Sequence, residues 1–166
     1  MRLVIDLQSA QGGSSRLRGI GRLSRELALA MARDSGSHEV LLALNGVFPE
    51  AADDLLTAFD GVLDRRAIRF WHAAGGTASI EPDSEARRLV SEHIRARFLR
   101  GLAPDVVHVS SLFEGIGDDV ITSLPPALDL TEEPPYVATM YDLIPLIRRD
   151  QYLDGAWAYN NIIRDW

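Results

Sequence analysis

The chain has 166 residues, of which 46% are hydrophobic, so it is long enough for one domain with a sizeable core. Its 17 basic and 24 acidic residues give a net charge of -7, which argues against a nucleic-acid partner held by a bulk positive field. Cysteine and lysine are both absent, which excludes disulfides, thiolate nucleophiles, cysteine-bound zinc and a lysine Schiff base.

The first 34 residues have the pattern of a buried strand, a glycine-rich loop and a helix. The strand is the apolar run from Leu3 to Ile5, which is typical of a parallel sheet covered on both faces. The loop follows Asp6 and contains several glycines and serines. We expect the helix to bury one face in the core, formed by apolar residues at helical spacing: Ile20, Leu23, Leu27 and Met31.

The start of this helix is a candidate anion site. Unpaired N–H groups and the helix dipole favour a negative charge at a helix N-terminus. Four arginines surround it: Arg16, Arg18, Arg22 and Arg25. Because cations oppose the dipole there, they make more sense facing a bound phosphate or carboxylate. The alternative is a plain strand-to-helix turn with a solvated basic edge.

The rest of the chain continues to alternate strands with helices. We expect further strands over residues 40–44, 67–73, 104–110 and 136–146, and helices over 49–64, 82–101 and 156–166. This pattern predicts an α/β fold, a Rossmann-like parallel sheet flanked by helices, with strand order 3-2-1-4-5. The loops after residues 7, 44, 73, 110 and 141 should gather at the ligand-binding edge.

The helix predicted over residues 82–101 is amphipathic. Its core face should be Ala86, Val90, Ile94 and Phe98. Its outer face should be basic and consist of Arg87, Arg88, Arg95, Arg97 and Arg100. Such a face is either solvated or lies on anionic lipid, and we expect the solvated form.

Several polar residues are expected at the carboxyl ends of the strands. Asn45 occupies the place where a dinucleotide-binding fold has an acidic residue for the ribose, which disfavours an NAD-dependent oxidoreductase. His108 and Ser110 should lie at the ligand edge, with a packed histidine as the alternative for His108. Residues 114–133 are acidic and rich in proline, which predicts an irregular segment over that edge.

Three segments together resemble the amino-terminal half of bacterial group 1 glycosyltransferases, which are retaining enzymes of the GT-B fold. The segments are residues 12–31 (GGSSRLRGIGRLSRELALAM), 104–115 (PDVVHVSSLFEG) and 140–153 (MYDLIPLIRRDQYL). The resemblance covers essentially the whole chain. It implies that residues 1–166 are the amino-terminal Rossmann-like domain, cut within its last helix, and that a carboxyl-terminal donor-binding domain is missing.

The resemblance also implies site residues. Tyr141 and Asp142 fall where relatives commonly have His-Asp beside the transferred sugar, and we assign them as catalytic candidates. The donor-phosphate loop would be Gly12, Gly13, Arg18, Gly19, Ile20, Gly21 and Arg22. The acceptor cleft would be Arg16, His108, Ser110 and Glu114. No metal site and no cofactor are expected, because the nucleotide-sugar is a substrate.

The implied function is to move a sugar from a nucleotide-sugar to a polysaccharide, O-antigen or lipid-linked glycan. The alternative is a non-catalytic binding subunit that pairs with a separate donor-binding chain. We expect a cytoplasmic protein, with room for a peripheral contact at the inner face of the membrane. We expect the fragment alone to transfer no sugar. We also expect its last helix either to form a homodimer contact or to pack across the edge strand of the sheet. The apolar residues concerned are Trp157, Ile162, Ile163 and Trp166.

Overall fold

In the computed structural model, which describes residues 1–124, 134–141 and 144–152, parallel strands form one sheet in the order β3-β2-β1-β4-β5. This confirms the predicted fold class and strand order. The elements of the described residues are β1 (Arg2–Asp6), η1 (Gln8–Ala10), α1 (Gly19–Arg33), β2 (Glu39–Asn45), α2 (Pro49–Ala58), η2 (Arg65–Ala67), β3 (Ile68–Trp71), α3 (Glu85–Gly101), β4 (Val106–Val109), β5 (Tyr136–Ala138), α4 (Ile144–Ile147) and α5 (Arg149–Tyr152).

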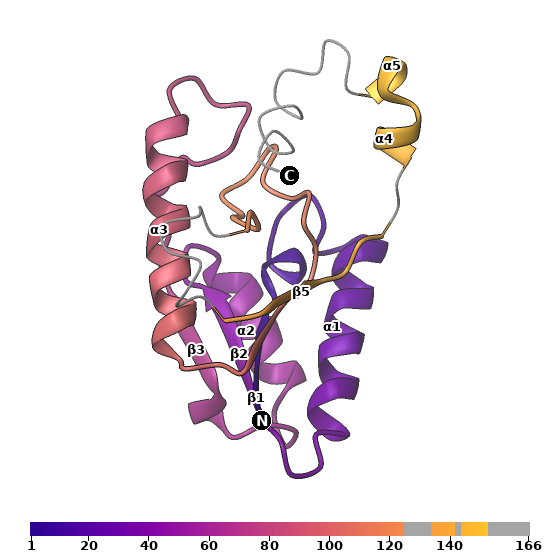
Figure 1. Cartoon of the computed structure of the whole chain (residues 1–166), viewed down its shortest axis with the longest axis vertical. Helices are drawn as coiled ribbons and strands as arrows, with labels where there is room; N and C mark the ends of the chain where they lie inside the picture. The colour runs from indigo at the N-terminus through magenta and orange to yellow at the C-terminus, as the bar shows by residue number, and fades with distance from the viewer. Residues whose placement is uncertain (125–133, 142–143, 153–166) are drawn as a thin grey trace.

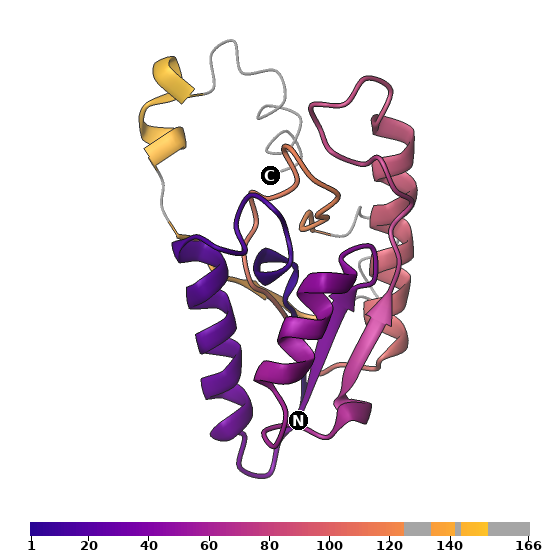
Figure 2. The same ribbon diagram turned by 180° about the vertical axis from the view of Figure 1, so that it is seen from behind.

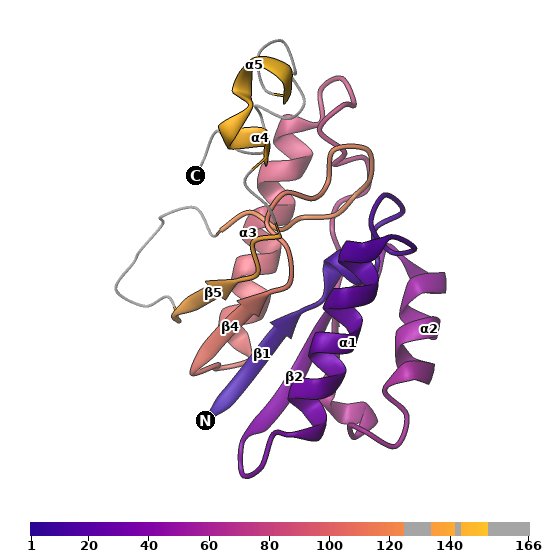
Figure 3. The same cartoon turned by 90° about the vertical axis from the view of Figure 1, so that its right-hand side faces the viewer.

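Helices cover both faces of this sheet (Figures 1 and 3). On one face, α1 and α2 pack on β1 and β2 through a core that includes Ala28, Leu55, Phe59, Ile5 and Leu42. On the other face, α3 packs through a second core that is built from Val4, Leu41, Ala43, Leu99, Val107, Val109 and Leu112. Alternate residues of β1 therefore point into different cores, as a strand buried on both sides requires.

The central strand β1 pairs with β2 on one side and β4 on the other, and Leu3 is opposite both Val40 and Val106. All the pairings are parallel, so the carboxyl ends of the strands meet at one edge of the sheet. The loops that carry most of the candidate site residues lie at that edge.

Some elements are shorter than predicted, and each changed boundary has a physical cause. Helix α2 stops at Ala58 rather than near residue 64, because Gly61 turns the chain with a φ of +73°. Helix α3 begins at Glu85, just after Asp83, whose φ of +58° is not helical. The last strand ends at Ala138, whereas the sequence predicts that it reaches residue 146. Pro145 lies in the first turn of α4, where the missing N–H of proline removes no helical hydrogen bond.

The predicted core face of α1 is wrong by about one residue. The buried positions are Gly21, Ser24, Ala28, Leu29 and Ala32, whereas Leu23 is 54% exposed. Most of these residues are small, so the helix approaches the sheet and the preceding loop closely. Leu29 is a larger side chain in the contact, whereas Ile20, Leu27 and Met31 are half-buried at its margin.

The predicted faces of α3 are wrong in part. As predicted, Arg87, Arg97 and Arg100 are exposed. Phe98 also packs against the core as predicted. No helix among the described residues, α3 included, is long and apolar enough to cross a membrane.

Arg88 and Arg95, which we expected on the outside, are buried, and so is Ser91. Val90 and Ile94, which we expected in the core, are exposed. Arg88 and Arg95 face inward because acceptors lie at the carboxyl edge: the backbone oxygens of Thr77 and Gly115 for Arg88, and the carboxylate of Asp6 for Arg95.

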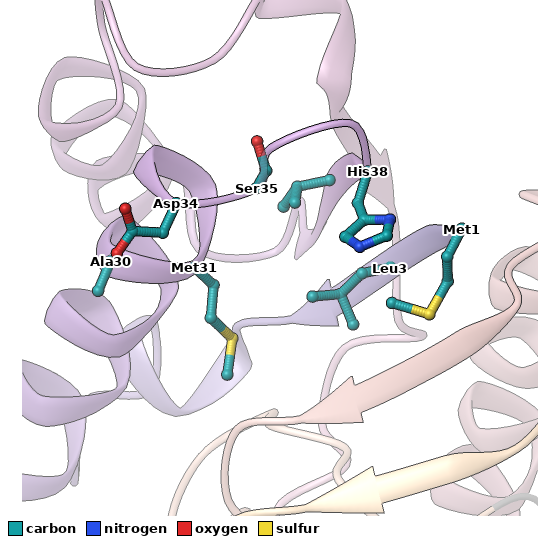
Figure 4. Close-up of a pocket in the computed structure, with 8 residues that line it drawn as sticks. Met1, Leu3, Ala30, Met31, Asp34, Ser35 and His38 are labelled. Atoms are coloured by element: carbon teal, nitrogen blue, oxygen red, sulfur yellow. The ribbon is translucent and has the colours of Figure 1, made fainter.

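A cavity of about 410 Å³ lies at the opposite, amino-terminal edge of the sheet (Figure 4). Met1 and Leu3 from the start of β1 and Met31 from the end of α1 supply much of its apolar lining. Asp34, Ser35 and His38 from the loop between α1 and β2 complete one side. The cavity is therefore remote from the loops at the carboxyl ends of the strands.

Candidate functional site

The carboxyl end of β1 carries a buried ion pair. Arg95 donates from Nε to Oδ2 of Asp6 at 2.5 Å and from Nη1 to the backbone oxygen of Ser123 at 2.6 Å. Asp6 and Arg95 are each 1% exposed. Since the two charges are removed from water together, each depends on the other for compensation. The pair therefore joins α3 to the end of β1. We call the buried polar residues at this carboxyl edge of the sheet the polar floor.

Two glutamines extend this polar floor to β2. Gln8 donates from Nε2 to Asp6 and to the backbone oxygen of Ile121, and its Oε1 accepts from Asn45 and from the N–H of Ile121. Gln11 forms a pair of bonds with the backbone of Asn45, at 2.8 and 3.0 Å. Asn45 is completely buried, so it is part of the floor and is not exposed to a ribose.

The glycines of the loop have different surroundings. A Cβ built on Gly21 would lie 2.5 Å from the backbone oxygen of Ser15, and one on Gly12 would lie 2.8 Å from Oδ2 of Asp118. A Cβ on Gly13 or Gly19 would meet nothing within 4 Å. Gly12 and Gly21 are therefore required for packing within the chain, whereas Gly13 and Gly19 leave open space.

The start of α1 keeps donors available. Arg22 donates its backbone N–H to Arg18, but the N–H groups of Gly19 and Ile20 have no hydrogen-bond partner among the described residues. The side chains of Arg18 and Arg22 are exposed and form no ion pair within the described part of the chain.

Two of the four arginines at this end are already paired. Arg16 forms an ion pair with Asp54 of α2, and Arg25 pairs with the adjacent Glu26. Arg16 therefore fastens the loop to α2, which is a structural contact distinct from the acceptor-cleft role we predicted for it. That predicted role stays a prediction.

A chain of hydroxyl groups connects the ends of three strands. Ser9 Oγ donates to Ser24 Oγ at 2.7 Å. It also lies 2.6 Å from Ser110 Oγ, where either hydroxyl can donate. Ser24 Oγ lies 2.6 Å from the hydroxyl of Tyr141, which also donates to the backbone oxygen of Ile20 at 3.4 Å. The half-buried Tyr141 is thus held against the start of α1, while Asp142 lies outside the described residues.

His108 lies on β4 and bonds through Nε2 to Oγ1 of Thr139 at 2.9 Å. Burial lowers the pKa of His108 below 6.5, and the negative charge of Asp6 opposes this shift. Its Nδ1 is buried and has no hydrogen-bond partner among the described residues. A neutral imidazole in this position acts as part of the packed floor.

Glu114 lies under the glycine-rich loop and is 7% exposed. Ser111 donates to its Oε1 at 2.9 Å. Burial raises the pKa of the Glu114 carboxyl above 4.5, and the charge of Asp118 raises it further, whereas hydrogen bonds from Ser111 and Ser15 oppose the rise. Burial therefore favours the protonated form of this carboxyl.

The acidic segment crosses the edge as predicted, at least over residues 114–124, where it has no helix or strand. Asp118 accepts from the N–H and the hydroxyl of Ser14, and Asp119 accepts from the N–H and hydroxyl of Thr77. The segment therefore joins the loop after β1 to the loop after β3.

The structure brings most of the predicted site residues to one edge, but at different depths. Arg18, Gly19 and Arg22 are at the surface, whereas His108, Ser110 and Glu114 are in the floor. Sequence reasoning missed Gln8, Gln11 and Arg95, which hold the floor together. Only the position of Gln8 and Gln11 directly after a buried strand could have signalled them. No three His, Asp or Glu side chains group as metal ligands in the described ranges.

Two relatives from Escherichia coli, each named a serotype-specific mannosyltransferase, match the chain. One is 30% identical over 156 residues and the other 29% identical over 130 residues, which are 92% and 76% of this chain. The chain is homologous to part of these mannosyltransferases. It spans less than a fifth of their length, 18% and 15% respectively.

No protein-family model matches the chain, and no solved structure matches it. The comparison of function therefore rests on the homology to mannosyltransferases. It agrees with the resemblance to glycosyltransferases that residues 12–31, 104–115 and 140–153 indicate.

Proposed function

We propose that this chain is the acceptor-side part of a glycosyltransferase that moves mannose from a nucleotide-sugar to a growing glycan. The observation that carries the proposal is the 30% identity to a mannosyltransferase across 92% of the chain. The glycan would be an O-antigen, a related surface polysaccharide or a lipid-linked precursor. The nucleotide-sugar is a substrate, so the proposal includes no cofactor.

The start of α1 supports a role in holding the donor's phosphates. The N–H groups of Gly19 and Ile20 are available, and the exposed guanidinium groups of Arg18 and Arg22 lie beside them in the chain. Departure of a nucleoside diphosphate leaves negative charge on the phosphate, which fixed positive groups stabilise. Because a Cβ at Gly19 would meet no atom of the described residues within 4 Å, the bare backbone there favours close approach by a ligand.

The buried polar residues beneath this loop support the same proposal, because they would hold the site residues in fixed positions. Among them, His108, Ser110 and Glu114 would shape the acceptor side through the residues they hold and not by direct contact. Tyr141, held by Ser24, would present its ring to the transferred sugar. Positioning of this kind lowers the entropic part of an activation barrier.

The test is transfer of labelled mannose from a nucleoside diphosphate sugar to a glycan acceptor by the protein that contains this chain. Gly19→Val should reduce turnover on the order of 10²-fold, because a β-branched side chain blocks approach of the phosphate. Its unfolding free energy should hardly change. Turnover within a few-fold of wild type would remove this loop from the site.

The matched control is Gly101→Val, at the last residue of α3, where a Cβ likewise meets nothing within 4 Å. It should leave turnover unchanged. Absence of mannose transfer by the wild-type protein, with binding of the glycan retained, would instead favour the non-catalytic binding subunit.

A further inference from the structure

Strand β3 forms one edge of the sheet, and among the described residues no strand pairs with its outer side. Figures 1 and 2 show it as the outermost strand on that side of the sheet. The backbone oxygen of Trp71 accepts from the N–H of Gly46, so the backbone groups of Trp71 point toward β2. Since these groups alternate in direction along a strand, the N–H and C=O of Phe70 point to the outer side. We call this outer side of β3 the open edge.

The two faces of β3 differ in chemistry at the open edge. Phe70 lies opposite Leu44, which belongs to the core under α1 and α2, so its side chain is on that face, where it is 40% exposed. Arg69 lies opposite Ala43, which belongs to the core under α3, so its exposed side chain is on the other face. A strand added to this edge would therefore have an aromatic ring beside one of its faces and a cation beside the other.

A small cavity of about 50 Å³ lies next to the start of β3, on the same face as Phe70. Its lining consists of Leu56, Phe59, Asp60, Leu63, Arg65 and Ile68. Four of these six residues are apolar, which favours an aliphatic side chain as the group that enters it.

The open edge is basic within an acidic chain. Arg65, Arg66 and Arg69 are exposed and form no ion pair with another described residue. Residues 64–71 contain these three arginines and one acid, Asp64, so their local charge is +2 in a chain of net charge -7. Asp64 accepts from the N–H of Arg66. If two copies of the chain met edge to edge, their arginines would repel each other, whereas an acidic segment would be attracted.

We propose that the open edge of β3 binds an extended, acidic segment of a partner protein as an added strand. Aliphatic side chains of the segment would lie on the face of Phe70 and of the small cavity, and acidic side chains on the face of Arg69. In strand addition of this kind, hydrogen bonds between main chains supply affinity and alternate side chains supply specificity. The proposal does not depend on the transferase function.

The first test uses a short peptide of alternating valine and glutamate, labelled for fluorescence anisotropy and added to the protein that contains this chain. It should bind at least about fivefold more tightly than a peptide of alternating valine and lysine, because its carboxylates pair with exposed arginines. Added salt should weaken the binding. Equal affinity for the two peptides, or binding of neither, would overturn the proposal.

Methylated peptides test whether the contact is made through the backbone. In an extended peptide of this sequence, the N–H groups of the valines all point to one edge and those of the glutamates to the other. Methylation of the backbone nitrogens in one of these two sets should abolish binding, whereas methylation of the other set should leave it largely unchanged. Equal effects of the two methylations would show that the peptide does not bind as an added strand.

Variants assign the binding to the open edge. Arg69→Glu should weaken binding of the valine-glutamate peptide about fivefold and should strengthen binding of the valine-lysine peptide. Phe70→Ala should weaken binding of the valine-glutamate peptide about twofold to fivefold, because a pair of side chains on neighbouring strands is lost. Both residues are exposed, so we expect the variants to fold, which thermal unfolding checks.

Two changes on α1 are the matched controls. Arg33→Glu reverses an exposed cation in its last turn, and Leu23→Ala shortens an apolar side chain that is 54% exposed. Both should bind the peptides like wild type. If the β3 variants also bind them like wild type, the peptide lies elsewhere and the proposal is wrong. If the peptides do not bind and Phe70→Ala abolishes self-association in sedimentation, the open edge is a contact between copies and the proposal is likewise wrong.

Discussion

Arg95 and Asp6 form an ion pair that contains one side chain from α3 and one from the central strand, at 2.5 Å and with each residue 1% exposed. Asp6→Ala should destabilise the protein by about 3 to 5 kcal/mol, because it leaves the guanidinium buried and uncompensated. Urea-induced unfolding measures this. The paired change Asp6→Asn with Arg95→Met should recover part of the loss, since no buried charge remains.

The control for that prediction is Glu39→Gln, which breaks the exposed ion pair with Arg2. It should cost less than about 1 kcal/mol. An Asp6→Ala variant no less stable than Glu39→Gln would mean that water reaches the buried pair.

Gly21 and Gly19 provide a matched pair of substitutions in the same helix. Gly21→Ala should destabilise the protein by about 1 to 3 kcal/mol, because its Cβ would lie 2.5 Å from a backbone oxygen that cannot easily move. Gly19→Ala should be neutral or stabilising by up to about 1 kcal/mol, since space is open and alanine favours a helix. Thermal unfolding compares them, and equal stability would show that the loop shifts away from the helix.

Glu114 should make stability depend on pH. Burial raises its pKa in the folded state above the 4.5 of the unfolded chain, so between the two pKa values only the folded state holds the proton. The stabilisation is present below about pH 4.5 and is lost as the pH rises through the raised pKa. Wild type should therefore lose stability relative to Glu114→Gln as the pH rises. A difference in unfolding free energy that changes in the opposite sense would show that the carboxyl is ionised and stabilised in the fold.

The contact between Ser24 and Tyr141 can be measured with a double-mutant cycle. Ser24→Ala, Tyr141→Phe and the double variant should give a coupling energy of about 0.5 to 1.5 kcal/mol in urea unfolding, the net value of one hydrogen bond. Ser37→Ala, at an exposed serine, is the control and should not couple to Tyr141→Phe. Additive effects of Ser24→Ala and Tyr141→Phe would place the phenol away from Ser24.

The strands and their order could be predicted from the sequence because most strands contain an apolar run bounded by polar turn residues. Val40 to Leu44 is one such run, and β2 contains all of it. Parallel strands connected by helices admit few arrangements. The edge that gathers the loops follows directly from the strand direction.

The orientation of α1 and α3 could not be predicted in the same way. Hydrophobic periodicity assigns a leucine to the core and an arginine to the solvent, but Arg95 has a buried acceptor in Asp6, which is distant in the sequence. In α1, Gly21 and Ser24 are buried because they are small, while Leu23 is outside. The predicted sites on Asp142 and on residues 156–166 lie outside the described residues.

The position of β1 at the centre of the sheet has a consequence during synthesis. β1 emerges from the ribosome before the other strands of this sheet and pairs with β2 soon afterwards, but its other partner, β4, begins roughly 100 residues later. At roughly 5 to 20 residues per second, the second edge of β1 stays unpaired for about 5 to 20 s. Its apolar side chains, including Val4 and the residues that face the α3 side, are exposed throughout that interval. Nascent chains are therefore most exposed to aggregation, and most in need of a chaperone, before Val106 is translated.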